Sequence, residues 1–270
     1  MKANTAIGIG CAFFGLLMGA MMDGTQVPAF FNIPALLIVC VGTAGVTLAG
    51  TSMAQFKQIP KLYKLSFSPP ELNALERVRL LVNFAEMARR EGLLALESDV
   101  DQVEDPFIKR GLQMVIDGLE PETVEEVLEI EIEATHTRHM KGIQMLAGMG
   151  GYSPTLGVLG TVVGLVNVLG NLSDPNGLGE SIATAFIATL LGVGMANVVW
   201  LPLSQNLKAR DAAETAERRM ALVAILSIQA GDNPRIVAQK LQSFASPAEV
   251  RAASTAEPEG AAPAATAEAA

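Results

Sequence analysis

Four long apolar stretches, separated by polar segments, set the pattern of this chain. They cover residues 5–22, 33–50, 143–172 and 182–203, and none of them contains Lys, Arg, Asp or Glu. A helix needs about 20 apolar residues to cross the hydrocarbon core of a bilayer. The pattern therefore predicts an all-α membrane protein with four transmembrane helices.

The long polar segment, residues 51–142, carries helical patterns of its own. Apolar positions recur at helical spacing from Leu75 to Ala88, and Gly92 follows as a helix end. The pairs Asp105-Pro106 and Pro121-Glu122 each place a proline at a helix start, where its missing N–H costs nothing. We expect a large helical domain between the second and third transmembrane helices.

The chain changes character twice after residue 203. Residues 204–245 are polar with helical spacing, interrupted at residues 231–234 by Gly, Asp, Asn and Pro, and we expect a broken C-terminal helix there. Residues 246–270 are rich in Ala, Glu, Pro and Thr, a composition typical of a disordered tail.

Positive charge is distributed unevenly around the predicted transmembrane helices. Of 19 Lys and Arg residues, 11 lie before the third apolar stretch in residues 51–142, and 7 follow residue 203. The short loops Asp23–Asn32 and Ser173–Glu180 contain none. Lys and Arg favour the cytoplasmic side of a membrane. Both termini and the helical domain are therefore predicted to be cytoplasmic, and both short loops to face outward.

Composition supports membrane insertion and excludes the commoner enzyme classes. Only 17% of residues are charged, against about 25% in soluble domains, and the mean hydropathy is +0.36. No glycine-rich loop is followed by Lys and Ser or Thr, so there is no phosphate-binding loop for ATP. Gly157, Gly160 and Gly164 lie in an apolar stretch with no preceding strand, which rules out dinucleotide binding. We do not expect an enzyme or a cofactor.

Histidine and cysteine give little indication of a metal site. His136 and His139 are three residues apart on a predicted helix, but no third ligand is evident, and we expect solvated histidines. Cys11 and Cys40 both lie in apolar stretches, where they act as small reduced side chains.

Small residues in the last two apolar stretches indicate close helix packing. Gly160 and Gly164 are four residues apart, as are Ala188, Gly192 and Ala196. Such spacing lets helix backbones approach each other in a bilayer, where apolar burial gives no driving force.

Thr161 and Thr189 are the deepest polar residues in these two stretches. Each hydroxyl can bond back to its own helix, or it can line a hydrated path. A path for ions also needs a group that binds and releases them, usually an intramembrane carboxylate. Because the four stretches contain none, a partner protein would have to supply it.

The last two stretches resemble the signature hairpin of the MotA/PomA family of flagellar stator subunits. The resemblance rests on GYSPTLGVLGTVVGLVNVL, a short DPxxLG loop and SIATAFIATLLGVGMANVVWLPL. The polar segments MARREGLLALE and DPFIKRGLQMVIDG are similar to that family's cytoplasmic loop. The resemblance covers about residues 1–230, in order.

The family resemblance implies a partner, an assembly and a location. It implies a ring of five copies in the bacterial inner membrane around two MotB-type subunits, each bearing an ion-binding aspartate on its one membrane helix. Ion flow would turn the ring, and charged residues of the ring would push the rotor protein FliG.

The resemblance also assigns roles to individual residues. It implies pore-facing hydroxyls, prolines at the inner ends of the pore helices, rotor-facing charges and an acid near the cytoplasmic ion exit. The pore-facing hydroxyls would be Thr161 and Thr189, and the prolines would be Pro154 and Pro202. The rotor-facing charges would be Arg89, Arg90 and Glu97, and the acid near the ion exit would be Glu131. Pro154 lies inside the third apolar stretch, where we expect a kink.

The resemblance implies that the transported ion is H⁺ or Na⁺. Sodium-type relatives resemble one another in an aspartate at the place where this chain has Asn32. The paired threonines are compatible with sodium, so the two signals conflict. We favour protons slightly.

Two other functions compete with the stator role. The ExbB/TolQ channel subunits, which energise outer-membrane processes, share the pore hairpin but resemble a three-span layout with an outer N-terminus. The two apolar stretches before residue 51 argue against that layout. A membrane-anchored enzyme or scaffold would be expected to show catalytic motifs, and the chain has none that we recognise.

Overall fold

The computed structural model describes residues 2–24, 27–67, 74–170 and 175–244, and every regular element in these ranges is a helix. The predicted all-α class is therefore confirmed for the described part of the chain. The tail 246–270, predicted to be disordered, lies outside the described residues.

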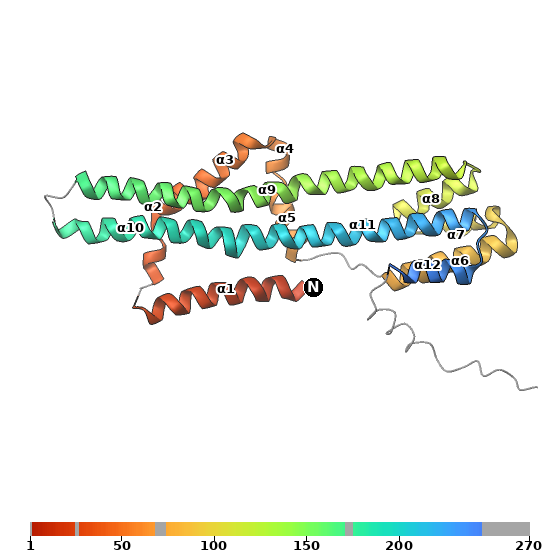
Figure 1. Ribbon diagram of the computed structural model, residues 1–270, viewed down its shortest axis with the longest axis horizontal. Helices are drawn as coiled ribbons and strands as arrows, with labels where there is room; N and C mark the ends of the chain where they lie inside the picture. The colour runs from red at the N-terminus through yellow and green to blue at the C-terminus, as the bar shows by residue number, and fades with distance from the viewer. Residues whose placement is uncertain (1, 25–26, 68–73, 171–174, 245–270) are drawn as a thin grey trace, which may run out of the picture. The chain divides into compact units, whose positions relative to one another are not determined.

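The chain folds into two compact units, each built from two stretches of sequence. The spanning unit comprises the described residues of 1–71 and 135–212, and the polar unit comprises those of 72–134 and 213–270. Two long helices, α9 (Pro121–Gly170) and α11 (Leu201–Gln229), belong partly to each unit (Figure 1).

The spanning unit contains all four helices that are long and apolar enough to cross a membrane. The candidate spans are Thr5–Met22, Ile33–Gly50, part of the helix Pro121–Gly170 and part of the continuous helix Ser181–Gln229. Four helices that could cross a membrane are therefore present where the sequence predicted transmembrane helices. The elements of this unit, besides parts of α9 and α11, are α1 (Lys2–Met22), η1 (Val27–Phe30), α2 (Ile33–Leu36), η2 (Leu37–Val41), α3 (Gly42–Gly50), α4 (Met53–Phe56), α5 (Ile59–Phe67), α10 (Pro175–Gly194) and η4 (Met195–Trp200).

Two π-helical turns interrupt the spans, and sequence periodicity did not indicate either of them. One is η2, in the second span, and the other is η4, which joins α10 to α11. After η4, the fourth apolar helix continues past Leu203 as α11, which ends at Gln229.

A small apolar core joins α1, α5, α9 and α11 within the spanning unit. Its buried residues are Ile143, Leu146, Met149, Leu203 and Leu207. Leu62 and Tyr63 of α5 pack against this core, and burial raises the pKa of Tyr63 to about 12. Arg210 closes one end, because its guanidinium donates to the backbone oxygens of Leu65 at 2.9 Å and Ser66 at 3.2 Å.

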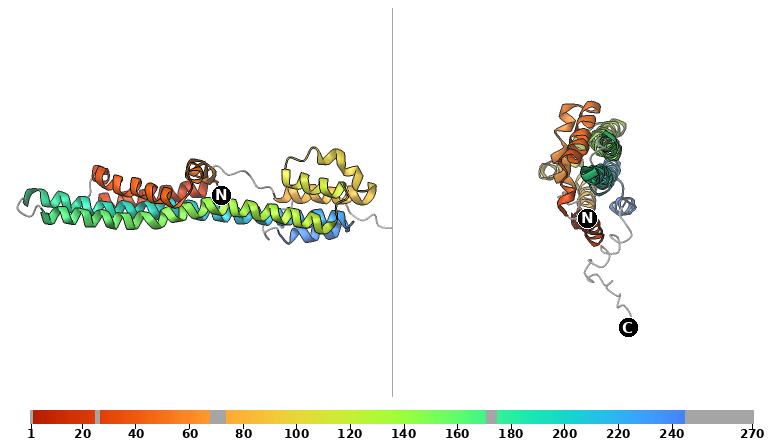
Figure 2. Two further views of the ribbon diagram at one scale, coloured as in Figure 1. Left: turned by 90° about the horizontal axis from the view of Figure 1, so that it is seen from above. Right: turned by 90° about the vertical axis from the view of Figure 1, so that its left-hand side faces the viewer.

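The polar unit has a larger core of leucine, isoleucine and valine side chains, including Leu81, Leu112, Leu128 and Ile225. Its elements, besides parts of α9 and α11, are α6 (Ala74–Glu91), η3 (Leu93–Leu96), α7 (Glu97–Val100), α8 (Pro106–Ile116) and α12 (Pro234–Gln242). Helices α6 and α12 pack against each other, and Figure 2 shows the short helices of this unit gathered around the two long ones.

Helix ends in the polar unit follow the residues that predicted them. Gly92, Gly118 and Gly231 come after α6, α8 and α11 with φ values of 88°, 78° and 71°, a conformation in which glycine carries no Cβ penalty. Asp105 caps α8 by accepting from the Phe107 N–H at 2.9 Å, and Asn233 caps α12 by accepting from the Arg235 N–H at 3.0 Å.

Candidate functional site

The hairpin of α9 and α10 brings two helix backbones into direct contact at glycines. A Cβ placed on Gly157 would lie 2.8 Å from the carbonyl oxygen of Ala188, and one on Gly192 would lie 2.5 Å from that of Ser153. A Cβ placed on Gly160 would likewise lie 2.6 Å from the Cβ of Ala188, and one on Gly164 would lie 2.6 Å from the Cβ of Ala185. The predicted small-residue packing is confirmed, and Gly157, which the sequence did not single out for packing, also meets the backbone of α10.

The close approach of the backbones places Thr161 and Thr189 against each other. Their hydroxyls are hydrogen-bonded, and either one can donate. Thr161 Oγ1 also lies 3.1 Å from the Ala185 carbonyl oxygen, and both hydroxyls lie within 3.3 Å of the Gly157 carbonyl oxygen. The two hydroxyls have two protons to donate, and three kinds of acceptor are within reach: the other hydroxyl and the carbonyl oxygens of Gly157 and Ala185. The pair can reverse its polarity by rotating hydroxyls alone.

Both threonines are half-buried, so neither residue is sealed inside the hairpin. The two alternatives left open by the sequence are thus not exclusive. Each hydroxyl can bond to a helix backbone and still face a path supplied by other chains. That these residues line an ion path stays a prediction.

Further polar contacts tie the second span to this hairpin. Asn32 caps α2 by accepting from the Ala35 N–H at 3.1 Å, and its amide donates to Thr184 Oγ1 at 2.9 Å. Thr43 Oγ1 lies 3.2 Å from Ser153 Oγ, and both side chains are fully buried. Asn32 therefore has a structural function as a helix cap and an interhelical donor. The Thr43–Ser153 pair joins residues 110 positions apart, which no local pattern indicated.

Each of the two prolines lies inside a continuous helix. Pro154 lies inside the 50-residue α9 and directly follows the buried Ser153. Pro202 lies in the first turn of α11, immediately after the π-helical turn η4, whose last hydrogen bond runs from the Leu201 N–H to the Ala196 oxygen. A widened turn suits a proline, because the carbonyl that its missing N–H leaves free gains room for another partner. The kink at Pro154 and the coupling role of both prolines stay predictions.

The predicted rotor-facing charges lie on the polar unit. Arg89 and Arg90 form the exposed end of α6, and Glu97 begins α7 with its side chain exposed. Arg90 pairs with Glu86 at 4.0 Å, and its side chain is 77% exposed. Because exposed pairs at this distance contribute little stability, these charges are available to a partner.

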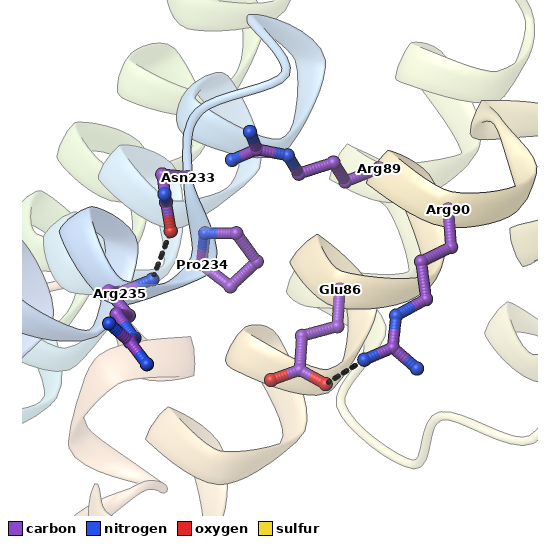
Figure 3. A pocket seen from close by; sticks show the side chains of 6 residues that line it. All are labelled: Glu86, Arg89, Arg90, Asn233, Pro234 and Arg235. Atoms are coloured by element: carbon purple, nitrogen blue, oxygen red, sulfur yellow. Dashed lines mark hydrogen bonds and ion pairs between the residues drawn. The ribbon is translucent and has the colours of Figure 1, made fainter. Parts of the chain in front are cut away.

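An open depression of about 400 Å³ collects three arginines at this end of the unit (Figure 3). Its lining comes from α6 and from the start of α12 and the turn before it: Glu86, Arg89, Arg90, Asn233, Pro234 and Arg235. Sequence reasoning missed Arg235. The only local signal was the Asn233–Pro234 helix start, which did not indicate that α12 packs beside α6.

Glu131, the predicted residue at an ion exit, pairs with two arginines in the polar unit. One is Arg110, and the other is Arg218, whose Nη1 lies 4.0 Å from Glu131 Oε1. Arg218 also stacks on Phe107 at 5.5 Å, so the cluster is part of the packing of this unit. A role of Glu131 in ion exit stays a prediction.

The two histidines contradict the expectation of solvated side chains. His136 Nδ1 lies 2.6 Å from Asp211 Oδ2, and His139 Nδ1 lies 3.0 Å from Asp211 Oδ1. Asp211 is buried, and the histidine side chains are only 39% and 35% exposed. The prediction failed because Asp211 is 72 and 75 residues away in sequence. No group of three metal-ligating residues with suitable placement occurs in the described ranges.

Comparison with known proteins gives consistent results for sequence and structure. Residues 99–220 match the model of the MotA/TolQ/ExbB proton channel family. Motility protein A of Borreliella burgdorferi is 35% identical over 247 residues, which cover 92% of this chain and 95% of the relative.

Two solved structures share the fold over nearly the whole chain. The structure of C. jejuni MotAB matches with a TM-score of 0.87 at 31% identity and covers 91% of this chain and 96% of the other. The structure of the flagellar MotAB stator complex from Bacillus subtilis matches with a TM-score of 0.86 at 34% identity, covering 92% and 98%.

Proposed function

The chain belongs to the motility protein A family, and on this basis we propose that it is the A-type subunit of a flagellar motor stator. It forms an ion channel together with a MotB-type subunit and converts ion flow into torque on the rotor. The ExbB/TolQ alternative is not favoured, because Motility protein A of Borreliella burgdorferi and the two MotAB structures match almost the full length of the chain.

The observation that carries this proposal is the chemistry of the spans. Their polar groups are hydroxyls and amides, and no carboxylate lies in residues 5–22, 33–50, 142–170 or 181–203. A chain of this kind can line a path but has no group that binds and releases a proton or sodium ion. The MotB-type partner supplies that aspartate, and the Thr161–Thr189 hydroxyl pair lies beside its path.

Torque leaves the subunit through the depression on the polar unit. Arg89 and Arg90, with Arg235 beside them, present positive charge, and Glu97 adds a negative charge nearby in sequence. The rotor protein FliG is the partner. Charged contacts of this kind orient a transient partner and exchange quickly, as a stepping rotor requires.

The stator role sets location and assembly. The subunit lies in the bacterial inner membrane with both termini in the cytoplasm, where 18 of its 19 Lys and Arg residues would then lie in the segments 51–142 and 204–270. Five copies surround two MotB-type subunits, and protons are the favoured ion. Pro154 and Pro202 lie where movement in the hairpin would pass to the helices that continue toward the polar unit.

A clean deletion tests the role directly. Cells that lack the chain should assemble filaments and fail to swim, and swimming by such cells would refute the proposal. Swimming speed measured against external pH and sodium in the complemented strain then identifies the ion, since a proton motor loses speed without a proton gradient and ignores sodium.

Arg90→Glu tests the rotor contact. The variant should insert and assemble normally but swim poorly in viscous medium, where torque limits speed. Arg79→Glu is the matched control, because Arg79 is an exposed arginine on the same helix that does not line the depression. Equal swimming of both variants would exclude the depression as the rotor contact.

A further inference from the structure

A second hollow, of about 270 Å³, lies in the spanning unit between the end of α3, α4 and α9. Its residues come from two stretches, 47–55 and 141–152. Gly50 ends the second candidate span, and Lys141 is the last charged residue before the charge-free residues 142–170 of α9. Both stretches therefore place the hollow where a spanning helix leaves the apolar core of a bilayer.

The hollow holds hydrogen-bond donors that the fold does not use. Lys141 is exposed and forms no ion pair with any residue that the structure describes. Gln55 accepts from the Ser52 N–H through its carbonyl oxygen at 3.2 Å, which leaves its amide N–H groups free to donate outward. Gln144, one turn of α9 after Lys141, adds a second amide.

Tyr152 brings a fourth donor back to the same end of the hollow. Its ring folds over Gly148, since a Cβ placed on Gly148 would lie 3.5 Å from Cε2 and 4.0 Å from the hydroxyl oxygen. Side chains on a helix lean toward its N-terminus, so the hydroxyl points toward Lys141 and away from the apolar part of α9. Tyrosine with an apolar ring and a polar tip is typical of the interface between membrane and water.

The charge of the hollow and its surroundings is positive. Lys141 is the one ionisable amine in its lining, and the lining contains no carboxylate. Three exposed lysines follow Gln55 in the sequence: Lys57 directly after α4, and Lys61 and Lys64 on α5. The apolar side of α5 is covered by the small core, so these lysines are left for the membrane surface.

We infer that this hollow binds the phosphate group of an anionic phospholipid. Lys141 provides the charge, Gln55, Gln144 and Tyr152 donate hydrogen bonds to phosphate oxygens, and the acyl chains leave on the apolar side past Gly148. Thr51 donates its own proton to the Thr47 carbonyl, so it can only accept, which suits the hydroxyl of a glycerol headgroup. The inference requires membrane insertion but not a motor function.

The test uses the purified full chain in nanodiscs of phosphatidylethanolamine and phosphatidylglycerol, with a trace of phosphatidylglycerol that carries a photoreactive headgroup. Peptide mass spectrometry should locate the label in residues 47–55 and 141–152. Lys141→Gln should reduce labelling there about fivefold, the loss expected for one lysine at an anionic surface. Lys141→Arg should retain it, and so should Lys208→Gln, an exposed lysine of α11 outside the lining.

Each other outcome overturns the inference. Equal labelling of the Lys141→Gln and Lys208→Gln variants would show general attraction to the surface. Loss of label on adding inorganic phosphate would show a site for free phosphate. No label in the wild-type hollow, with cross-links between two copies of the chain, would show that a second subunit covers it. No swimming assay is involved, so failure here leaves the stator role untouched.

Discussion

In both the α9–α10 hairpin and the core of the polar unit, helices pack on helices, but the contact residues are small in the hairpin and large in the polar unit. At the hairpin, Gly157 and Gly192 bring backbones together, and the Thr161–Thr189 hydroxyl pair bridges the helices. In the polar unit, large fully buried side chains such as Leu112 and Ile225 fill the space. Burying leucine gains free energy only if the alternative is water, and lipid offers no such gain.

The difference teaches where each region tolerates change. Apolar side chains that the single chain leaves uncovered on the spans, such as Phe14 and Val166, are 66% and 64% exposed. The hairpin tolerates no added volume at its crossing, whereas the polar unit tolerates no lost volume in its core. Four predictions test this contrast, each by thermal unfolding of the full chain in detergent followed by circular dichroism.

Leu112→Ala should give the largest effect. Leu112 is completely buried in the core of the polar unit, and removing such a side chain costs about 2–5 kcal/mol through lost burial and the cavity left behind. Leu94→Ala is the control, since Leu94 is 74% exposed and should change stability little. Similar melting temperatures for the two variants would mean that burial of large side chains does not hold this unit.

Gly157→Ala should give the next largest effect, here by adding volume where Leu112→Ala removes it. The new Cβ would lie 2.8 Å from a backbone oxygen that cannot rotate away, and overpacking costs about 1–3 kcal/mol. Gly45→Ala, where a Cβ meets nothing within 4 Å, should be neutral or slightly stabilising. A neutral Gly157→Ala variant would contradict the close backbone crossing.

Thr189→Val should cost less, because it removes one hydroxyl without changing shape. Interhelical hydrogen bonds in membranes contribute about 0.6 kcal/mol on average, and about 1.7 at most. Thr189→Ser retains the hydroxyl bonded to Thr161 and should behave like the wild type. If valine and serine variants melt alike, the hydroxyl pair does not stabilise the hairpin.

Asp232→Asn should have the smallest effect and should depend on pH. The hydrogen bond from Lys240, at 2.7 Å, lowers the pKa of Asp232 below its usual value of 3.8. A lowered folded-state pKa adds stability above the unfolded value, and this stability is lost as pH falls through the folded value. The difference between wild type and variant, at most about 1 kcal/mol for an exposed pair, should therefore be present at neutral pH and vanish well below pH 4. A difference that persists in acid would assign the effect to something other than the ion pair.

Much of the helical layout followed from local signals in the sequence. Four apolar stretches predicted four spanning helices, and Gly92 and Asp105 marked helix ends where the structure has them. These signals are reliable because helix ends and bilayer crossings depend on the chemistry of a few neighbouring residues. The family resemblance, carried by a continuous hairpin sequence, was confirmed by comparison with a relative that matches nearly the whole chain.

Tertiary structure decided what lies between residues distant in sequence. It brought Asp211 to two histidines that were expected to be solvated, placed Arg235 beside Arg89, and assembled the hollow around Lys141. It also inserted π-helical turns, which depend on how the helices fit their neighbours. Periodicity states which face of a helix is apolar but not which residue of another helix meets it, because that choice depends on packing across the whole fold.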